Sequence, residues 1–216
     1  GWWIADEGCV DTRLLVPAVH QAAEAEGATF CLGLTVTAVD PGGVIAGGQR
    51  FAGRPVVCAG AWTAAVPGLA TVPVAPVRGQ LVALGITGAA RCVVFGPGGY
   101  VVPRRDETVL GATMEHVGYA RGTTAAGLAS VLGAALALLP ALGEAPVSRH
   151  WSSFRPSSPD GRPVIGQAGG VWVASGHSRN GILLAPLTAT LLADAILEQA
   201  PLPPAWSPSR FLNPAG

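Results

Sequence analysis

Residues 171–196 read VWVASGHSRNGILLAPLTATLLADAI, and this stretch decides the fold that the sequence predicts. A β-type run (171–175) leads into a loop with Gly176 and Gly181, and an apolar helical segment follows. A strand, a glycine-containing loop and a helix in this order are typical of an α/β layer. The start of such a helix offers unpaired backbone N–H groups and a positive dipole end, so it attracts electron-rich groups. The loop is therefore a candidate binding site, and an ordinary tight turn is the alternative interpretation.

The loop is not a phosphate-binding P-loop. Its glycines have the spacing G-x-x-x-x-G, but Ile182 and Leu183 stand where that motif needs Lys and Ser or Thr. The sequence contains no Lys at all, and its 13 basic residues are all Arg. Chemistry that needs a Schiff-base lysine is therefore excluded for this chain.

Outward from this stretch, helical and β-type segments alternate along the chain. Helices are predicted over residues 12–27, about 124–139 and 181–197. Asp11 and Thr123 are the expected N-caps of the first two helices, and Gly27 and Pro140 are their expected stops. The expected strands span residues 28–32, 34–39, 43–47, 55–60, 74–84, 91–95, 99–105, 108–113, 145–154, 163–167 and 171–175. The Pro-rich tail, 201–216, is expected to be loosely ordered.

Composition narrows the class of protein. The 13 acidic side chains balance the 13 basic ones without basic runs, so neither nucleic acid nor an anionic membrane is an expected partner. The four cysteines form no CxxC pair and the four histidines no cluster, so a disulfide framework and a metal site are not expected. The longest apolar stretches contain Pro140, Pro186 and Asp194, whereas a membrane-spanning helix needs roughly 20 mostly apolar residues. We expect a soluble cytoplasmic protein, and a chain that begins mid-domain because residues 1–7 hold neither a Met nor a signal peptide.

Three further residues are candidates for a ligand pocket. Arg155 follows an apolar strand and precedes a turn, where its planar guanidinium suits a carboxylate, although a solvated or structurally paired Arg is the commoner case. Tyr100 and Met114 lie in predicted adjacent strands and can face one cavity, although two core residues would show the same spacing. The residues alone leave both questions open.

Seven blocks of sequence, taken together, carry a family resemblance. They are VDTRLLVPAVHQAAEAEGA (10–28), VVCAGAW (56–62), PVRGQ (76–80), GYVVPRR (99–105), LGATME (110–115), FRPSSPDGRPVIG (154–166) and GHSRNGILLAP (176–186). In this order they resemble the glycine oxidase branch of the D-amino-acid oxidase family of FAD-dependent oxidoreductases. The last two blocks are the most specific to that family.

The resemblance implies roles for individual residues. Arg155 is the expected anchor of the substrate carboxylate, Tyr100 and Arg179 help to hold that group, and Met114 lines the pocket. The loop is expected to contact the flavin ring, and one further residue is expected to make a backbone contact on the adenine side. These cofactor-binding residues are Gly176, His177, Ser178, Arg179, Asn180, Gly181 and Ile182 in the loop, and Val36 on the adenine side.

The resemblance also implies a fold, which is α/β with α+β character. A partial FAD-binding lobe is interleaved with a substrate lobe that is built on a mixed, largely antiparallel sheet. Residues 1–9 would end the substrate lobe, 10–73 form part of the FAD-binding lobe, 74–155 form the substrate-binding lobe and 156–216 complete the FAD-binding lobe. The family's N-terminal GxGxxG unit, which binds the FAD pyrophosphate, has no counterpart in the sequence.

The implied activity is FAD-dependent oxidative deamination of glycine or another small amino acid or amine. Dioxygen would be the electron acceptor and hydrogen peroxide a product, and the family suggests a link to thiamine biosynthesis. Such a reaction requires the Cα–H bond to be held against the flavin, which is positioning rather than acid–base catalysis. Related sarcosine oxidases attach the flavin through a Cys shortly before the equivalent of Asp160, and residues 154–159 contain none. The FAD is therefore expected to be non-covalent.

Other functions stay open at this stage. One is a D-amino-acid oxidase or dehydrogenase of different specificity. A generic α/β binding domain is a further possibility. Another class is a non-catalytic fragment or subunit whose partner carries the dinucleotide-binding region. Homo-oligomerisation, or a separate chain that supplies this region, is accordingly among the expected partnerships.

Overall fold

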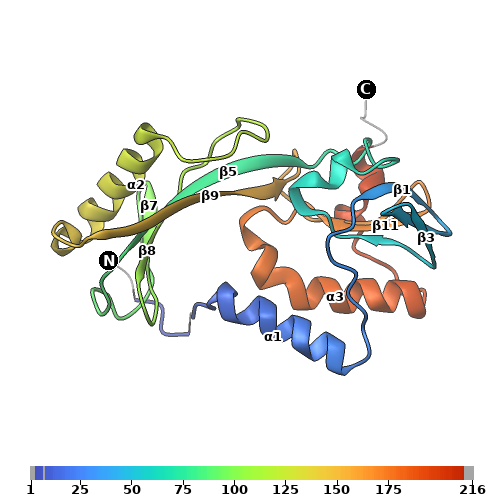
Figure 1. The fold of residues 1–216 in the computed structure, drawn as a ribbon, viewed down its shortest axis with the longest axis horizontal. Helices are drawn as coiled ribbons and strands as arrows, with labels where there is room; N and C mark the ends of the chain where they lie inside the picture. Colours follow the sequence, from blue (N-terminus) through green and yellow to red (C-terminus); the bar gives the residue numbers. More distant parts are fainter. Residues whose placement is uncertain (1–2, 7, 212–216) are drawn as a thin grey trace. The chain divides into compact units, whose positions relative to one another are not determined.

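The computed structural model of this protein describes residues 3–6 and 8–211, and these residues form two compact units (Figure 1). Unit 1 consists of Gly1–Leu32, Gly79–Met114 and Arg121–Ser153. Unit 2 consists of Gly33–Arg78, Glu115–Ala120 and Phe154–Gly216. The expected lobe boundaries, 73/74 and 155/156, lie close to the unit boundaries 78/79 and 153/154, but residues 10–32 group with unit 1 rather than with unit 2. The assignment of FAD-binding and substrate-binding roles to the units stays a prediction.

Unit 1 is built around a five-stranded sheet of order β6-β7-β8-β5-β9, in which β6/β7, β7/β8 and β8/β5 pair antiparallel. The strands are β6 (Val94–Gly96), β7 (Gly99–Pro103), β8 (Thr108–Gly111), β5 (Ala75–Leu84) and β9 (Val147–Ser157). Helix α2 (Ala125–Leu138) and the 3-10 turn η2 (Pro140–Leu142) pack on it, and α1 (Thr12–Ala25) belongs to the same unit. The core consists of Val82, Leu84, Val101, Leu110, Val131, Ala135 and Leu142.

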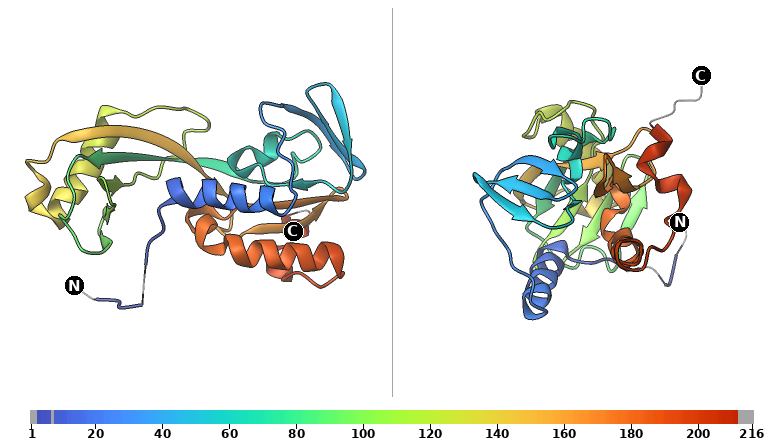
Figure 2. Two further views of the ribbon diagram at one scale, coloured as in Figure 1. Left: turned by 60° about the horizontal axis from the view of Figure 1, so that its bottom comes forward. Right: turned by 90° about the vertical axis from the view of Figure 1, so that its right-hand side faces the viewer.

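Unit 2 contains two three-stranded sheets (Figure 2). One is the antiparallel series β1 (Val36–Asp40), β2 (Gly43–Ala46) and β3 (Gln49–Ala52). The other has the order β10-β11-β4, formed by β10 (Val164–Ala168), β11 (Val171–Ser175) and β4 (Val56–Val57), with β11 and β4 parallel. The other elements are α3 (Gly181–Leu197) and the 3-10 turns η1 (Gly60–Ala65), η3 (Ser178–Asn180), η4 (Pro204–Trp206) and η5 (Pro208–Phe211). Its core consists of Leu69, Val72, Val74, Val164, Ala168, Val171 and Val173. The mixed α/β fold is the predicted one.

The helices lie where the sequence predicts them, because their start and stop signals are local. The Asp11 carboxylate accepts a hydrogen bond from the Arg13 N–H at 3.0 Å, so Asp11 is the N-cap of α1. The prediction of Thr123 as the second cap is wrong by one residue. Thr124 accepts the hydrogen bond from the Gly127 N–H at 3.1 Å, since its extended backbone points the hydroxyl at the first helical turn.

One predicted strand is absent from the structure, and one observed strand was not predicted. Residues 28–32 form no strand, and all five are exposed without a pairing partner among the described residues. A β-type run becomes a strand only when another strand supplies its hydrogen bonds. Strand β3 was not predicted; it turns back from β2 through Gly47 and Gly48 at φ +57° and +79°. Both angles match a two-residue hairpin turn, and a Gly-Gly pair is a sequence signal for it.

The prediction of a loosely ordered tail is also wrong for its first part. Residues 204–206 and 208–211 form the 3-10 turns η4 and η5, Pro208 is buried, and Phe211 packs against the core of unit 2. The proline-rich composition suggested disorder, but contacts with β10 order the segment. Residues 212–216 lie outside the described residues.

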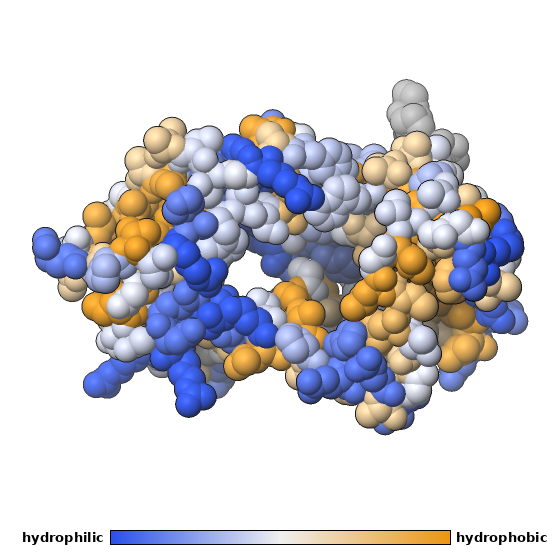
Figure 3. All heavy atoms as spheres, in the orientation of Figure 1, coloured by the Kyte–Doolittle hydropathy of each residue, from blue (hydrophilic) through white to orange (hydrophobic). Residues whose placement is uncertain are grey.

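Helix α3 is more apolar than the sequence analysis allowed. With the preceding turn it forms a 20-residue helical run, Ser178–Leu197, of mean hydropathy 1.6, and Pro186 lies inside it. By length and composition alone this run could cross a membrane. A core helix of a soluble protein passes the same test, so the finding is weak evidence. Figure 3 shows apolar side chains at the surface in the region of α3, where Leu183 is 78% exposed.

Candidate functional site

The loop between β11 and α3 has a backbone that requires glycine. Gly176 is buried with φ +73°, and a Cβ there would come within 2.9 Å of Val164 Cγ2 and 3.5 Å of the Arg162 carbonyl oxygen. The chain therefore passes closely over the start of β10 before it turns into the helix. Asn180 stands at the N-cap of α3 without a side-chain capping bond. The turn η3 leads directly into α3, and His177 at its N-cap also makes no side-chain capping bond, so the start of the helical run Ser178–Leu197 has no side-chain cap, which suits an electron-rich ligand group.

His177 holds this loop to the helix. Its Nε2 lies 3.0 Å from the hydroxyl of Thr188, which is buried in α3, and its carbonyl accepts a hydrogen bond from the Asn180 N–H at 3.0 Å. Burial lowers the pKa of His177, so the imidazole is neutral at pH 7. The loop is therefore shaped by a neutral hydrogen bond and carries its positive charge on Arg179, which is exposed.

The loop and Arg155 lie in the same unit and meet along β9. Arg155 is half-buried inside β9, which runs three residues further than predicted, and Ser157 forms a β-bridge with His177. Residues 155 and 157 project from the same face of the strand, since side chains alternate. The structure therefore brings Arg155, His177 and the rest of the loop into one neighbourhood of unit 2.

Tyr100 and Met114 belong to unit 1. Tyr100 lies in β7 opposite Gly111 of β8, and its ring covers Gly111 so closely that a Cβ there would clash. Met114 follows the end of β8 and is 65% exposed, so it is not a core residue. The meeting of these two residues with Arg155 stays a prediction, and so does the adenine-side contact of Val36, which opens β1 in unit 2.

Two features of unit 2 were not singled out by sequence reasoning. Trp62, Tyr119 and Phe154 form an aromatic cluster with ring centroids 5.9–6.0 Å apart, and the Tyr119 hydroxyl donates to the Ala61 carbonyl at 2.8 Å. Only 6% of the residues are aromatic, and one of them, Phe154, directly precedes Arg155. This adjacency was the sequence signal that could have indicated the cluster. The buried hydroxyls of Thr63 and Ser175, 2.8 Å apart, tie η1 to the end of β11, and nothing in their sequence spacing predicts this contact.

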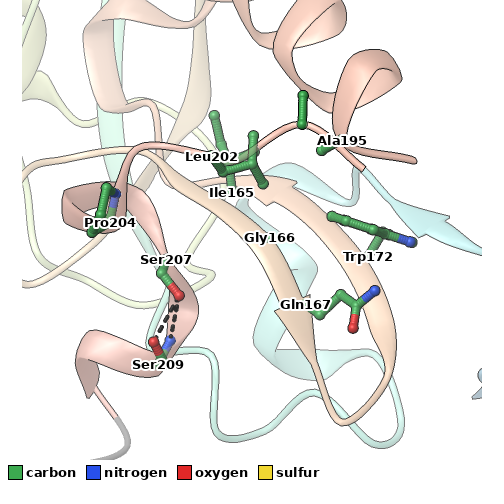
Figure 4. A pocket seen from close by; sticks show the side chains of 10 residues that line it. Ile165, Gly166, Gln167, Trp172, Ala195, Leu202, Pro204, Ser207 and Ser209 are labelled. Atoms are coloured by element: carbon green, nitrogen blue, oxygen red, sulfur yellow. Dashed lines mark hydrogen bonds between the residues drawn. The ribbon is translucent and has the colours of Figure 1, made fainter. Parts of the chain in front are cut away.

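A shallow pocket of about 410 Å³ lies elsewhere in unit 2, between the C-terminal segment and the β10–β11 hairpin (Figure 4). Its walls are mainly apolar, and the Ser207 and Ser209 hydroxyls are hydrogen-bonded to each other at 2.7 Å. The lining residues are Ile165, Gly166, Gln167, Trp172, Ala195, Ala200, Leu202, Pro204, Ser207 and Ser209. None of the predicted site residues lines it.

Comparison with known proteins identifies the family. Residues 1–195 match the family described as FAD dependent oxidoreductase (DAO), and the chain belongs to it. A bifunctional protein ThiO/ThiG of Synechocystis sp. is 42% identical over 230 residues, which cover 99% of this chain and 35% of that protein. A glycine oxidase of Pseudomonas putida is 38% identical over 172 residues, 73% of this chain and 45% of that protein.

The structural comparison agrees with the family. The crystal structure of glycine oxidase from Geobacillus kaustophilus matches with a TM-score of 0.82 and 32% sequence identity, over 91% of this chain and 57% of that one. The chain thus spans between about a third and somewhat over half of the length of these relatives. The predicted family is confirmed.

The family implies a flavin cofactor, and part of the chain fits one. The loop with its close-packed Gly176 and the uncapped start of α3 offer backbone N–H groups to an electron-rich ring edge. The pyrophosphate half of FAD has no matching element, because the sequence contains no G-x-G-x-x-G motif. The residues present therefore fit the flavin end of the cofactor only.

Proposed function

We propose that this chain is the substrate-binding and flavin-contacting part of an enzyme that oxidises glycine or another small amino acid. The observation that carries the proposal is the β-bridge between Ser157 and His177, which joins the strand of Arg155 to the glycine loop. Arg155, the proposed carboxylate anchor, and the loop proposed to hold the flavin ring are thereby neighbours in one unit. The relatives named glycine oxidase and ThiO/ThiG support the same activity and a place in thiamine biosynthesis.

The proposed roles of the residues are those that the family resemblance implies, and the chemistry of the side chains suits them. Arg155 would bind the substrate carboxylate through its two-pronged guanidinium, with Tyr100 and Arg179 as further donors and Met114 as an apolar wall. The loop 176–182 would hold the flavin ring, and the positive end of α3 would stabilise negative charge on it. A flavin held there would supply the acceptor for the hydride from the substrate Cα, and its reoxidation by dioxygen would give hydrogen peroxide. The imine would be released and hydrolysed to a keto acid and ammonia.

The FAD in this proposal is bound without a covalent link. The chain's four cysteines are Cys9, Cys31, Cys58 and Cys92, and none lies in the 154–159 stretch beside Arg155. The pyrophosphate would be held by a dinucleotide-binding region in another segment or in a separate chain, since no motif for it is present here. We propose a cytoplasmic location for the enzyme.

Substitution of Arg155 tests the proposed function in the protein that also contains the dinucleotide-binding region. Truncating one partner of a buried charged pair costs ~2–5 kcal/mol, so Arg155→Ala should lower kcat/KM for glycine about 30-fold or more. Arg155→Lys should restore little, because an ammonium cannot form the bidentate contact. Arg91→Ala, at an exposed arginine of unit 1, is the control.

Peroxide production and flavin reduction are measured separately. Unchanged kcat/KM in Arg155→Ala would contradict the role of the anchor. Flavin reduction by amino acids without peroxide formation would favour a dehydrogenase over an oxidase. No flavin reduction by any small amino acid would favour the non-catalytic alternative.

A further inference from the structure

Arg210, near the carboxyl end of the chain, binds the turn formed by residues 158–162, which follows the strand of Arg155. Its guanidinium donates to both oxygens of Asp160, from Nε at 2.8 Å and from Nη2 at 3.0 Å. The same group donates to the Arg162 carbonyl at 3.2 Å and to the Ser207 carbonyl at 3.0 Å. The side chains of Arg210 and Asp160 are only 15% and 33% exposed. Such a bidentate, partly buried pair is stronger than an exposed ion pair.

Asp160 is the centre of this turn. Besides Arg210, its Oδ1 accepts hydrogen bonds from the Ser158 hydroxyl at 3.1 Å and from the Arg162 N–H at 3.2 Å. The Ser158 hydroxyl, which is buried, also lies 2.6 Å from the Arg162 carbonyl oxygen. Gly161 completes the turn at φ +70°. The Arg210 guanidinium is the main cause that lowers the pKa of Asp160 far below its ordinary value, so the pair is charged at any physiological pH.

The turn is in direct contact with the candidate site. Ser157, which precedes it, forms the bridge with His177, and Arg155 lies two residues earlier in the same strand. On the other side, the Arg162 carbonyl that Arg210 binds lies under Gly176, 3.5 Å from where a Cβ would be. Movement of this turn would therefore displace both the end of β9 and the glycine loop.

The tail that carries Arg210 is itself anchored. The Arg210 guanidinium lies 4.1 Å from the centroid of the Phe211 ring, which packs on the core of unit 2. Pro208 is buried against Gly166 of β10, where a Cβ would come within 3.0 Å of its Cδ. Figure 4 shows the segment with Pro204, Ser207 and Ser209 alongside this hairpin. The Arg210–Asp160 pair thus connects the turn to a segment that packs on the core of unit 2.

We propose that Arg210 is a positioning residue for the candidate site: through Asp160 it holds the 158–162 turn, and thereby Arg155 and the glycine loop, in the geometry that binds a carboxylate next to the flavin. This inference rests on the proposed function. In this proposal Arg210 acts on the site through its bonds to Asp160 and to the Arg162 carbonyl, and not by contact with the substrate or the flavin.

The test uses the flavin-loaded protein with its dinucleotide-binding region, and the variants Arg210→Met and Arg210→Lys. The matched control is Arg50→Met, because Arg50 forms a similar two-pronged pair with Asp40, at 2.9 Å for both contacts, in the β1–β3 sheet of the same unit. Four quantities are measured below the melting temperature of every variant. They are KM and kcat for glycine, the Kd of acetate from the flavin absorbance, and amide hydrogen exchange of residues 174–182.

Arg210→Met should raise KM for glycine and Kd of acetate roughly tenfold, the size expected for loss of one charge-assisted contact, with a smaller change in kcat. Amide exchange in 174–182 should become faster. Arg210→Lys should recover part of each effect, because it keeps the charge and loses the fork. Arg50→Met should leave all four quantities unchanged.

A lower melting temperature of Arg210→Met with unchanged KM, Kd and exchange would overturn the proposal. If Arg210→Met does not fold, the same comparison is decided by Arg210→Lys and Asp160→Asn. If Arg155→Ala also leaves acetate binding unchanged, the carboxylate site of the proposed function fails. Amide hydrogen exchange of residues 174–182 in Arg210→Met then still decides whether Arg210 positions the loop.

Discussion

Helices α1 and α2 are both 14 residues long and both have a side-chain N-cap, yet they differ completely in burial. Helix α2 packs on β6, β7 and β8 and buries Gly127, Val131 and Ala135. Helix α1 buries none of its residues, and Leu14 and Val19 are 70% and 59% exposed. Apolar spacing and a cap therefore suffice to form a helix, whereas burial requires a surface for that helix to cover.

The two helices are also held by different interactions. Helix α1 is tied to the β7–β8 hairpin by Arg13, which pairs with Asp106 at 2.7 Å and with the buried Glu107 at 3.2 Å. Helix α2 is held by apolar packing and by Gln80, a fully buried residue whose side-chain carbonyl accepts the Thr124 N–H at 2.8 Å. Unit 1 therefore has a finished core around α2, while α1 presents an apolar face that no described residue buries.

The largest expected effect is the difference in unfolding free energy between two variants, one with a charge on the apolar face of α2 and one with a charge on the apolar face of α1. Val131→Asp buries an unpaired carboxylate in the core of unit 1 and should cost more than ~3 kcal/mol of unfolding free energy. Val19→Asp on α1 should stay within about 0.5 kcal/mol, as expected at an exposed position. Urea denaturation of both variants measures this. Equal losses of unfolding free energy in the two variants would contradict the predicted difference between α1 and α2. A larger loss for Val19→Asp in the protein with the dinucleotide-binding region would show that this region covers α1.

A smaller difference is expected between the two caps. Thr124→Ala removes the cap of α2 and a hydrogen bond from Gln80 Nε2 at 3.2 Å, and it should cost about 1–2 kcal/mol. Thr124→Ser should restore most of this. Asp11→Ala should lower the melting temperature less, because the α1 cap stabilises a helix without buried residues. Thermal unfolding gives the melting temperatures of the three variants. A larger decrease for Asp11→Ala than for Thr124→Ala would contradict the prediction.

The smallest expected effect is the response of the caps to acid. The hydrogen bond from Arg13 lowers the pKa of Asp11 from 3.8 to about 2. A carboxyl group with a lowered folded-state pKa contributes stability above pH 3.8 that is lost as the pH falls towards 2. Thr124 does not titrate. Protection of the amides at the start of α1, measured relative to their intrinsic exchange rate at each pH, should therefore fall between pH 4 and 2 in the wild type but not in Asp11→Asn, while the start of α2 shows no such dependence.

The prediction of the fold from the sequence succeeded where interactions are local. The bounds of α1, α2 and α3 follow from apolar spacing and from caps that act over three or four residues. It failed for residues 28–32, which have a β-type composition but no neighbouring strand, and for the tail, whose order comes from β10. The candidate site was predicted by motif resemblance, and the bridge between Ser157 and His177 adds a contact that no spacing rule contains.

The sequence by itself determined the family, the helices and the strand–loop–helix order around Gly176. Only the tertiary structure decided that α1 stays uncovered among the described residues while α2 is buried, and that Arg210 binds Asp160, 50 positions away. The reason is physical. Helix propensity and capping depend on atoms within one or two turns of the chain, whereas burial and long-range ion pairs depend on which surfaces the whole backbone brings together.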